Sequence, residues 1–294
     1  RAWFNERRTN WRDQGATTSH EAEKLGKGTT SVVPYSTQDR SALAPEGSRE
    51  VLLWPDTFNN YFSPHIAQAV VEVLEHAGFR VRIPLVPLCC GRPLYDFGFL
   101  DRAKALLKNI LDTLQPEISA GIPIVGLEPS CVAVFRDELC NLFPHDDRAR
   151  ALSKQIFLLS EFVETNNVHF PSLNCRALLH GHCHQKSLMK MTAEESLLRR
   201  IGIDFQSPAP GCCGMAGSFG FEHDKYEIST AIGELELLPA VRNAPEDCLI
   251  IADGFSCREQ IAQLTNRRAL HLAEVLQMSM KTASPLASSA SPSF

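Results

Sequence analysis

Short apolar runs alternate with amphipathic stretches along most of the chain, and this alternation predicts strands separated by helices. The elements expected in the first half are a strand at 51–54, a helix at 66–76, a turn plus strand at 78–84, a helix at 101–114, a buried strand at 123–127, and a helical stretch that starts at Cys131 and closes near Leu142.

The second half shows the same order of elements. We expect a strand at 177–179, a helix at 193–200, a helix at 225–238, a strand at 249–252, and a helix through Leu264. Each half also carries a Cys-Cys-Gly triplet before its later strand and a single cysteine after it. Cys90 and Cys131 are 41 positions apart, and Cys213 and Cys257 are 44 apart (131 − 90 and 257 − 213). The chain therefore contains an internal repeat.

Strands that alternate with helices predict an α/β fold, here two related cysteine-rich repeats, each a small parallel sheet with flanking helices. In such sheets the loops beyond the carboxyl ends of the strands converge, and the cysteines of the repeat pattern fall in those loops. We therefore expect the cysteines of one repeat to meet.

The pattern also sets domain boundaries. We assign residues 1–49 to a polar linker, 50–165 to the first repeat, 174–280 to the second, and 281–294 to a disordered tail rich in Ser, Ala and Pro. The chain starts at Arg1 and its first methionine is Met189, so we expect the natural protein to extend upstream.

Composition narrows the class of protein. The chain has 294 residues, 44% of them hydrophobic and 21% charged, which is ordinary for a globular protein. A net charge of −5 argues against nucleic acid as a partner. Because no run is long and apolar enough to span a membrane and no secretory signal begins the chain, we expect a cytoplasmic protein.

Ten cysteines are too few for a disulfide scaffold of this length, and the adjacent pairs Cys89-Cys90 and Cys212-Cys213 favour metal ligation. The second repeat offers four candidate ligands: Cys183, Cys212, Cys213 and Cys257. Four thiolates suit a [4Fe–4S] cluster or a tetrahedral zinc. Adjacent cysteines point in different directions, and that favours a cluster with several irons.

The first repeat offers only Cys89, Cys90 and Cys131, because Asp56-Thr57 stands where the second repeat has Cys183. Three interpretations remain open here. The site is a degenerate remnant with a packing role, a zinc site completed by another residue, or a second cluster completed by Asp56 or a partner. A remnant or a weaker metal site is favoured over a full cluster.

Several other residues near the cysteines have two interpretations. Three further cysteines lie outside the pattern and are interpreted as packing residues. The histidines that bracket Cys183 have two interpretations: they ligate a metal or tune its properties, or they are loop residues whose hydrogen bonds are satisfied locally. Acidic residues beside the cysteine loops cap helices or modulate charge. The glycines of residues 214–220 bring backbone N–H groups to a cluster or form a tight turn, and Met215 and Phe219 fill core. The residues of the first three groups are Cys140, Cys175 and Cys248, then His180, His182 and His184, then Asp96, Glu128 and Asp253.

None of the common nucleotide-binding, hydrolase or zinc-protease motifs occurs in the chain. A metal site without a visible acid, base or nucleophile argues by elimination for electron relay, with bond breaking left to a cofactor elsewhere.

The cysteine motifs resemble those of the cysteine-rich CCG-domain family of iron–sulfur oxidoreductases, over about residues 51–278. That family includes the iron–sulfur subunit of glycolate oxidase and the cysteine-rich subunits of anaerobic glycerol-3-phosphate dehydrogenase and of heterodisulfide reductase. The motifs are PLCCGRPLY at 87–95, EPSC at 128–131, HGHCH at 180–184, GCCGMAG at 211–217 and DGFSC at 253–257.

The sequences of these motifs are most similar to those of long bacterial proteins in which an FAD-linked oxidase is fused to the iron–sulfur part. The oxidase of such proteins acts on D-lactate, glycolate or 2-hydroxyglutarate-like acids. Such proteins usually carry two ferredoxin-like motifs before the repeats, and this chain has neither. In family members with the fuller pattern, each repeat ends in Cys-x-x-Cys. In this chain Val134 and Gln260 stand in place of the second cysteine of that motif. Cluster ligation is therefore carried over to Cys183, Cys212, Cys213 and Cys257, and secondarily to the cysteines of the first repeat.

The resemblance implies an oxidoreductase component that relays electrons from FAD on a fused or separate dehydrogenase module through a [4Fe–4S] cluster toward a quinone or another membrane acceptor. Such a component would work in the cytoplasm, at the inner face of the membrane. Two alternatives remain: a zinc-stabilised docking scaffold, and a thiol–disulfide catalyst like heterodisulfide reductase.

Overall fold

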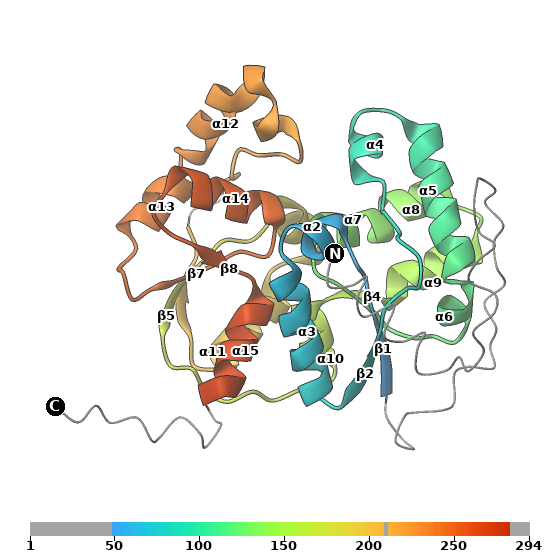
Figure 1. The fold of residues 1–294 in the computed structure, drawn as a ribbon, viewed down its shortest axis with the longest axis horizontal. Helices are drawn as coiled ribbons and strands as arrows, with labels where there is room; N and C mark the ends of the chain where they lie inside the picture. The colour runs from blue at the N-terminus through green and yellow to red at the C-terminus, as the bar shows by residue number, and fades with distance from the viewer. Residues whose placement is uncertain (1–48, 209–210, 283–294) are drawn as a thin grey trace, which may run out of the picture.

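The protein contains two four-stranded parallel sheets flanked by helices, as seen in a computed structural model that describes residues 49–208 and 211–282 (Figure 1). The first sheet has the order β2-β1-β3-β4 and the second the order β6-β5-β7-β8, so the two repeats share one topology. The strands are β1 (Arg49–Leu53), β2 (Phe79–Arg82), β3 (Ile124–Gly126), β4 (Ile156–Leu158), β5 (Arg176–Leu179), β6 (Asp204–Gln206), β7 (Leu249–Ile251) and β8 (Ala269–Leu270).

Helices cover both sheets. Those of the first repeat are α2 (Thr57–Tyr61), α3 (Pro64–His76), α4 (Arg92–Asp96), α5 (Leu100–Thr113), α6 (Gln115–Ser119), α7 (Pro129–Arg136), α8 (Glu138–Leu142), α9 (Asp147–Gln155) and α10 (Leu159–Thr165). Those of the second are the π-helical turn η2 (Gln185–Met189), α11 (Thr192–Arg200), the 3-10 turns η3 (Phe219–Phe221) and η4 (His223–Lys225), α12 (Tyr226–Gly233), α13 (Leu237–Asn243), α14 (Phe255–Leu264) and α15 (Leu272–Thr282).

The predicted parallel α/β architecture is confirmed, and every strand pairing is parallel. Three strands, β4, β6 and β8, were not expected from the sequence. β6 and β8 contribute only one or two apolar residues each, and β4 lies directly between α9 and α10, so its apolar residues do not stand out from the two helices. Because β4 pairs with β3, the sheet of the first repeat takes in residues beyond the helical stretch that we expected to close near Leu142.

The single helix expected at 225–238 is wrong. The structure has two helices there, α12 and α13, separated at residues 234–236. Pro239 supplies the reason, because a proline inside a continuous helix would lose a hydrogen bond and clash with the preceding turn. With α13 starting at Leu237, Pro239 falls in the first helical turn, where the missing N–H costs nothing.

The ends of the chain differ slightly from the expected boundaries. Arg49 begins β1 and does not belong to a linker, and Lys281 and Thr282 still belong to α15. Residues 1–48 and 283–294, to which the rest of the expected linker and tail belong, lie outside the described residues. Among the helices that are described, none combines the length and the apolar character needed to cross a bilayer.

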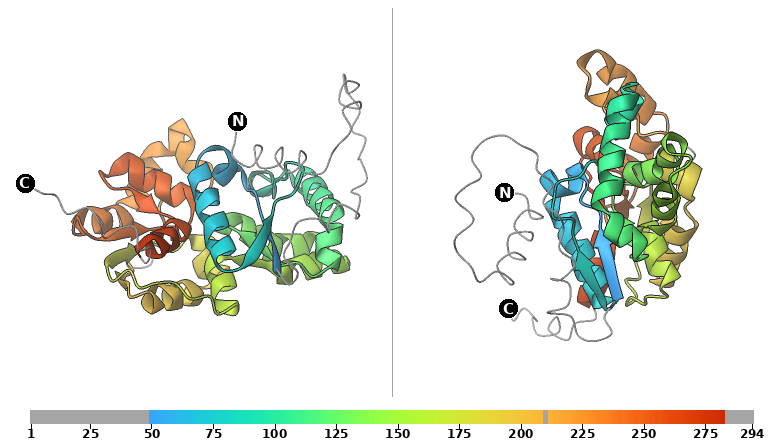
Figure 2. Two further views of the ribbon diagram at one scale, coloured as in Figure 1. Left: turned by 60° about the horizontal axis from the view of Figure 1, so that its bottom comes forward. Right: turned by 90° about the vertical axis from the view of Figure 1, so that its right-hand side faces the viewer.

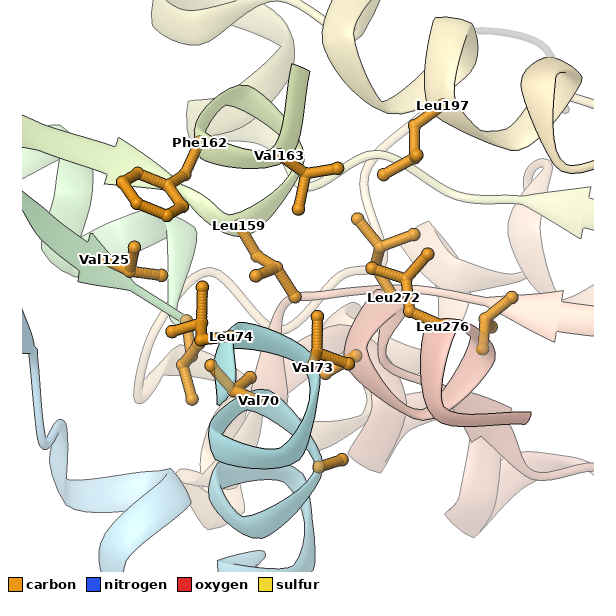
Figure 3. Packing of buried hydrophobic residues seen from close by; sticks show 14 of the residues in the cluster. Val70, Val73, Leu74, Val125, Leu159, Phe162, Val163, Leu197, Leu272 and Leu276 are labelled. Atoms are coloured by element: carbon orange, nitrogen blue, oxygen red, sulfur yellow. The ribbon is translucent and has the colours of Figure 1, made fainter. Parts of the chain in front are cut away.

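The largest cluster of buried apolar residues joins the two repeats (Figure 3). Helix α3 packs on α15, and α10 packs on α11. Each pair combines the helix after the first strand of one repeat with the helix after the fourth strand of the other, so the contact has approximate twofold symmetry. Leu74, Leu159, Leu197 and Leu276 lie in this shared core, all at most 2% exposed. Burial of this apolar surface fixes the repeats against each other.

The loops that carry the cysteines gather at one end of the molecule. In Figure 1, and again in the right-hand view of Figure 2, α4 and the α12 segment rise at that end. Both follow a Cys-Cys-Gly triplet, which comes after β2 in the first repeat and after β6 in the second. The carboxyl ends of the parallel strands therefore form the floor of the candidate site.

Candidate metal centre

The second repeat brings its four candidate cysteines together from three loops. Cys183 follows β5, Cys212 and Cys213 follow β6, and Cys257 lies in the first turn of α14 after β7. The side chains interact in sequence, Cys183 with Cys212, Cys212 with Cys213, and Cys213 with Cys257. Because β5 pairs with both β6 and β7, the topology of the sheet makes these loops neighbours.

The sulfur atoms differ in exposure and in proton affinity. Cys183 is exposed and Cys212 half-buried, whereas Cys213 and Cys257 are buried. Hydrogen bonds from Cys183 and then Cys213, together with one from the backbone of Gly214, lower the pKa of Cys212 to about 2. A hydrogen bond from Cys213 likewise holds the pKa of Cys257 well below its usual range, and His180 adds to this effect.

The two donating thiols shift in the opposite direction. The hydrogen bond to Cys212, followed by burial, raises the pKa of Cys183. Hydrogen bonds to Cys212 and Cys257 raise the pKa of Cys213. The pKa shifts thus alternate in direction among the four thiols, and the lowered pKa values of Cys212 and Cys257 favour the thiolate, the form that ligates metals.

The backbone conformation at Gly214, the last residue of this triplet, requires a glycine. Its φ is +92°, and an added Cβ would lie 2.0 Å from the carbonyl oxygen of Ser229 in α12. Its N–H donates to the Sγ of Cys212 at 3.3 Å. Met215 is 1% exposed and fills core as expected, whereas Phe219 is only half-buried.

The three histidines around Cys183 occupy different environments. His180 is buried and contributes to the low pKa of Cys257. His182 is also buried, and its Nδ1 accepts from the backbone N–H of His184 at 3.2 Å, which satisfies it locally. Burial, and then the charge of Arg92 in the first repeat, lower the pKa of His184 to about 4.

In the first repeat the three cysteines also meet. The Sγ atoms of Cys90 and Cys131 are 3.1 Å apart, and Cys89 interacts with Cys90. Asp56 lies near this group, but both of its carboxylate oxygens accept from Asn59, one from the backbone N–H at 3.0 Å and one from Nδ2 at 2.8 Å. Burial, and then the nearby Glu128, raise the pKa of Asp56 to about 6. Asp56 therefore acts here as the N-cap of α2.

The exposed thiol of Cys89 borders a cavity of about 220 Å³. Apolar and amide side chains line it, namely Pro55, Thr57, Asn60, Tyr61, Pro87, Leu88, Cys89, Leu106 and Asn109. Asn60 is buried, and its Oδ1 has no hydrogen-bond partner within the described part of the chain.

The remaining cysteines lie outside both groups. The Sγ of Cys140 lies 3.9 Å from the carbonyl oxygen of Ala149, and that of Cys248 lies 3.6 Å from the carbonyl oxygen of Leu249. Cys175 is half-buried beside the core that joins the repeats. These surroundings fit the packing role that the sequence predicted.

The positions at which fuller family patterns have a further cysteine are filled by other contacts. Val134 is 1% exposed in the core of the first repeat. Gln260 is buried, and its Nε2 donates to the backbone oxygen and the hydroxyl of Ser229 at 3.2 and 3.3 Å. Within residues 49–208 and 211–282, no three His, Cys, Asp or Glu side chains are arranged to hold a single metal ion.

An aromatic rim was not visible in the sequence. We define it as Tyr61 and Phe62 of the α2 segment, Phe97 and Phe99 between α4 and α5, Phe221 at the end of η3, and Tyr226 at the start of α12, all 46% to 66% exposed. These segments follow the carboxyl ends of β1, β2 and β6, the end of the sheets that carries the cysteine loops. Sequence periodicity does not distinguish an exposed aromatic from a buried one, so only the fold reveals the rim.

Comparison with known proteins identifies a cysteine-rich domain in the first repeat. A family model described as a cysteine-rich domain, CCG, matches residues 56–136. D-2-hydroxyglutarate dehydrogenase of Pseudomonas putida is 29% identical over 241 residues, which cover 81% of this chain and 23% of that protein. A subunit of the anaerobic glycerol-3-phosphate dehydrogenase of Escherichia coli K12 is 27% identical over 229 residues, 76% of this chain and 57% of that subunit.

Lactate utilization protein A of an Exiguobacterium species is 29% identical over 258 residues, which cover 79% of this chain and 99% of that protein. The chain thus spans about a quarter of the D-2-hydroxyglutarate dehydrogenase and just over half of the glycerol-3-phosphate dehydrogenase subunit. By name, the first relative is a dehydrogenase and the second a dehydrogenase subunit, so the matches connect this chain with oxidoreductases. The chain is thus similar to these proteins over most of its length, and its residues 56–136 match the CCG cysteine-rich domain.

Proposed function

We propose that this chain is the iron–sulfur, electron-transfer part of a flavin-dependent 2-hydroxyacid dehydrogenase of the D-lactate or glycolate type. Electrons would pass one at a time from FAD, on a fused or separate module, through a [4Fe–4S] cluster in the second repeat toward a quinone or another acceptor. The names of the relatives support a dehydrogenase, and the acid and the acceptor are part of the proposal.

The observation that carries this proposal is the meeting of Cys183, Cys212, Cys213 and Cys257 at one edge of the second sheet. Four sulfur donors, two of them favoured as thiolates, match the ligand set of a [4Fe–4S] cluster. Two of the four are adjacent in the chain, and adjacent cysteines that point in different directions suit a group with several metal atoms better than a single zinc ion.

When bound, the cluster would supply a one-electron carrier, and the protein around it has a distinct task. The N–H of Gly214 donates to the Sγ of Cys212, and hydrogen bonds to ligand sulfur are among the features that set a cluster's potential. Cys213 and Cys257 are buried, which excludes water from one side of the site. Cys183 is exposed, and it marks the side from which another redox group would approach.

The aromatic rim supports a protein partner on that side. Exposed aromatic residues are enriched at interaction surfaces. We therefore place the dehydrogenase module on the end of the molecule that carries the cysteine loops. The match covers 23% of the D-2-hydroxyglutarate dehydrogenase. Most of the chain of that relative therefore lies outside the matched region.

In the first repeat we propose a secondary site made of Cys89, Cys90 and Cys131, with zinc as its candidate metal. Cys90 and Cys131 are close enough to bind one metal ion together, but Asp56 is already engaged by Asn59. The first repeat therefore lacks a free fourth ligand among these residues, and we expect weaker metal binding there.

The test is to measure iron, zinc and acid-labile sulfide in the anaerobically purified chain and to record visible and EPR spectra. A Cys212→Ser, Cys213→Ser double variant removes the central ligands. A Cys140→Ser, Cys175→Ser double variant is the matched control, because both residues lie outside the two cysteine groups. We expect about four irons with matching sulfide in the wild-type and control proteins, and their loss in the first variant.

Stoichiometric zinc without iron or sulfide in the wild-type and control proteins would overturn the electron-relay proposal and support a docking scaffold. Turnover of a disulfide substrate by protein that contains no iron would instead support a thiol–disulfide catalyst.

A further inference from the structure

One buried carboxylate of the first repeat reaches the cysteine site of the second. Glu128 is 2% exposed and precedes α7, the helix that carries Cys131. Its Oε1 accepts from the backbone N–H of Ser130 at 3.4 Å and from the Ser130 hydroxyl at 2.9 Å. Its Oε2 accepts from the backbone N–H of Phe255 at 2.9 Å, across 127 positions of sequence. Phe255 is the first residue of α14, the helix that carries Cys257.

A second hydrogen bond crosses the interface beside the first. His271 is fully buried, and its Nδ1 accepts from the backbone N–H of Ala273 at 3.0 Å. The hydrogen of the neutral ring is therefore on Nε2, which donates to the carbonyl oxygen of Leu127 at 3.1 Å. Leu127 directly precedes Glu128. The loop before Cys131 is thus held to the second repeat at two consecutive residues.

The equivalent acidic residue of the second repeat does not cross. Asp253 precedes Cys257 as Glu128 precedes Cys131, yet its Oδ1 accepts from the backbone N–H of Leu272 within its own repeat at 2.8 Å. Stacked rings reinforce the crossing contact, because Phe58 of the first repeat lies parallel to Phe255 with ring centroids 4.2 Å apart. Of these two equivalent acidic residues, Glu128 therefore accepts from a backbone N–H of the other repeat, whereas Asp253 accepts from one of its own repeat.

We infer that Glu128 is a positioning residue that fixes the first turn of α14, so that the geometry of the second-repeat cysteine site is set by the first repeat. The N-termini of α7 and α14 both present N–H groups with partial positive charge, and the carboxylate between them satisfies one from each helix. Without it, Phe255 would lose the acceptor that anchors it two residues before Cys257.

This inference rests on the proposed function for its main measurement, the potential and EPR spectrum of a cluster at Cys257. The variant is Glu128→Gln, which keeps the size of the side chain but removes the negative charge and one acceptor oxygen. Glu117→Gln is the matched control. Glu117 is also a buried carboxylate of the first repeat, but it pairs with Arg82 at 3.1 Å.

In the whole chain, reconstituted anaerobically, we expect Glu128→Gln to keep its iron but to show a higher midpoint potential and a changed EPR spectrum. The potential rises because a nearby negative charge that disfavours the reduced cluster is gone. Glu117→Gln should retain the wild-type potential and spectrum. A wild-type potential and spectrum in Glu128→Gln, or equal shifts in both variants, would overturn the inference.

A readout that needs no cluster separates this inference from the proposed function. In the metal-free chain, hydrogen exchange of the Phe255 amide should be faster by roughly tenfold in Glu128→Gln, because a hydrogen bond to a charged acceptor is lost. The control should exchange at the wild-type rate. If no protein binds iron, the proposed function fails, and unchanged exchange at Phe255 would then sink the positioning role as well.

Discussion

The glycine that ends the second Cys-Cys-Gly triplet provides a sharp test of the site's backbone. Gly214→Ala adds a Cβ at a residue with φ of +92°, and that atom would lie 2.0 Å from the carbonyl oxygen and 2.9 Å from the carbonyl carbon of Ser229. These are backbone atoms of α12, so the helix itself must shift. The same oxygen accepts from Gln260, and that hydrogen bond would be strained too.

The magnitude follows from two contributions. A left-handed backbone costs a residue with a Cβ about 1 to 2 kcal/mol. Forcing extra volume against packed backbone costs about 1 to 3 kcal/mol more. We expect Gly214→Ala to lower the free energy of unfolding by about 2 to 5 kcal/mol from these sources combined, and to reduce metal retention, because the same turn carries Cys212 and Cys213.

Gly217→Ala is the matched control in the same loop. Gly217 also has a positive φ, +69°, but an added Cβ would meet only the Oδ2 of Asp96, at 3.8 Å. Only the backbone contribution of about 1 to 2 kcal/mol should then apply. The measurement is urea denaturation of the metal-free proteins followed by far-UV circular dichroism. Equal denaturation midpoints for the two variants would refute the reasoning, because they would show that contact with Ser229 carries no cost.

Buried groups elsewhere in the chain lead to three more predictions. Burial, and then the charge of Asp253, raise the pKa of Glu194 well above its usual range. The protonated carboxyl of Glu194 therefore contributes its full stabilisation below the pKa of the unfolded state, and this contribution is lost as the pH rises through the pKa of the folded state. In urea denaturation, the free energy of unfolding of Glu194→Gln should fall less between pH 5 and pH 9 than that of the wild-type protein. A variant with the wild-type pH dependence would contradict this. Leu276→Ala, in the core between the repeats, should cost about 2 to 5 kcal/mol, whereas Leu235→Ala, at a residue that is 74% exposed, should stay within about 0.5 kcal/mol. Thermal unfolding would compare them, and equal losses would argue against this packing. In metal-free protein, iodoacetamide should modify the exposed cysteines well before the buried ones, as mass spectrometry would show. Reconstitution of the iron–sulfur cluster without added zinc should protect the exposed cysteine of the second repeat and leave that of the first repeat reactive. Preferential labelling of buried thiols would contradict the site. The exposed pair is Cys89 and Cys183, and the buried set is Cys90, Cys131, Cys213 and Cys257.

The repeated α/β order and the gathering of the cysteines could be predicted from the amino-acid pattern alone. Apolar runs long enough to stand out became β1 and β3 in one repeat and β5 and β7 in the other. These are the two central strands of each sheet, whose burial on both faces requires continuous apolar residues. Since parallel strands end at one edge, the position of each cysteine after a strand was enough to predict that they meet.

The roles of short segments and of single side chains depend on the folded arrangement. The edge strands β4, β6 and β8 exist because a neighbour pairs with them, and that information lies outside their own two or three residues. Glu128 and Asp253 have equivalent places before their cysteines in the chain, yet only Glu128 crosses to the other repeat. The difference depends on which N–H group the packing of the two repeats brings within reach, and a buried carboxylate accepts from the donors that surround it in the folded chain.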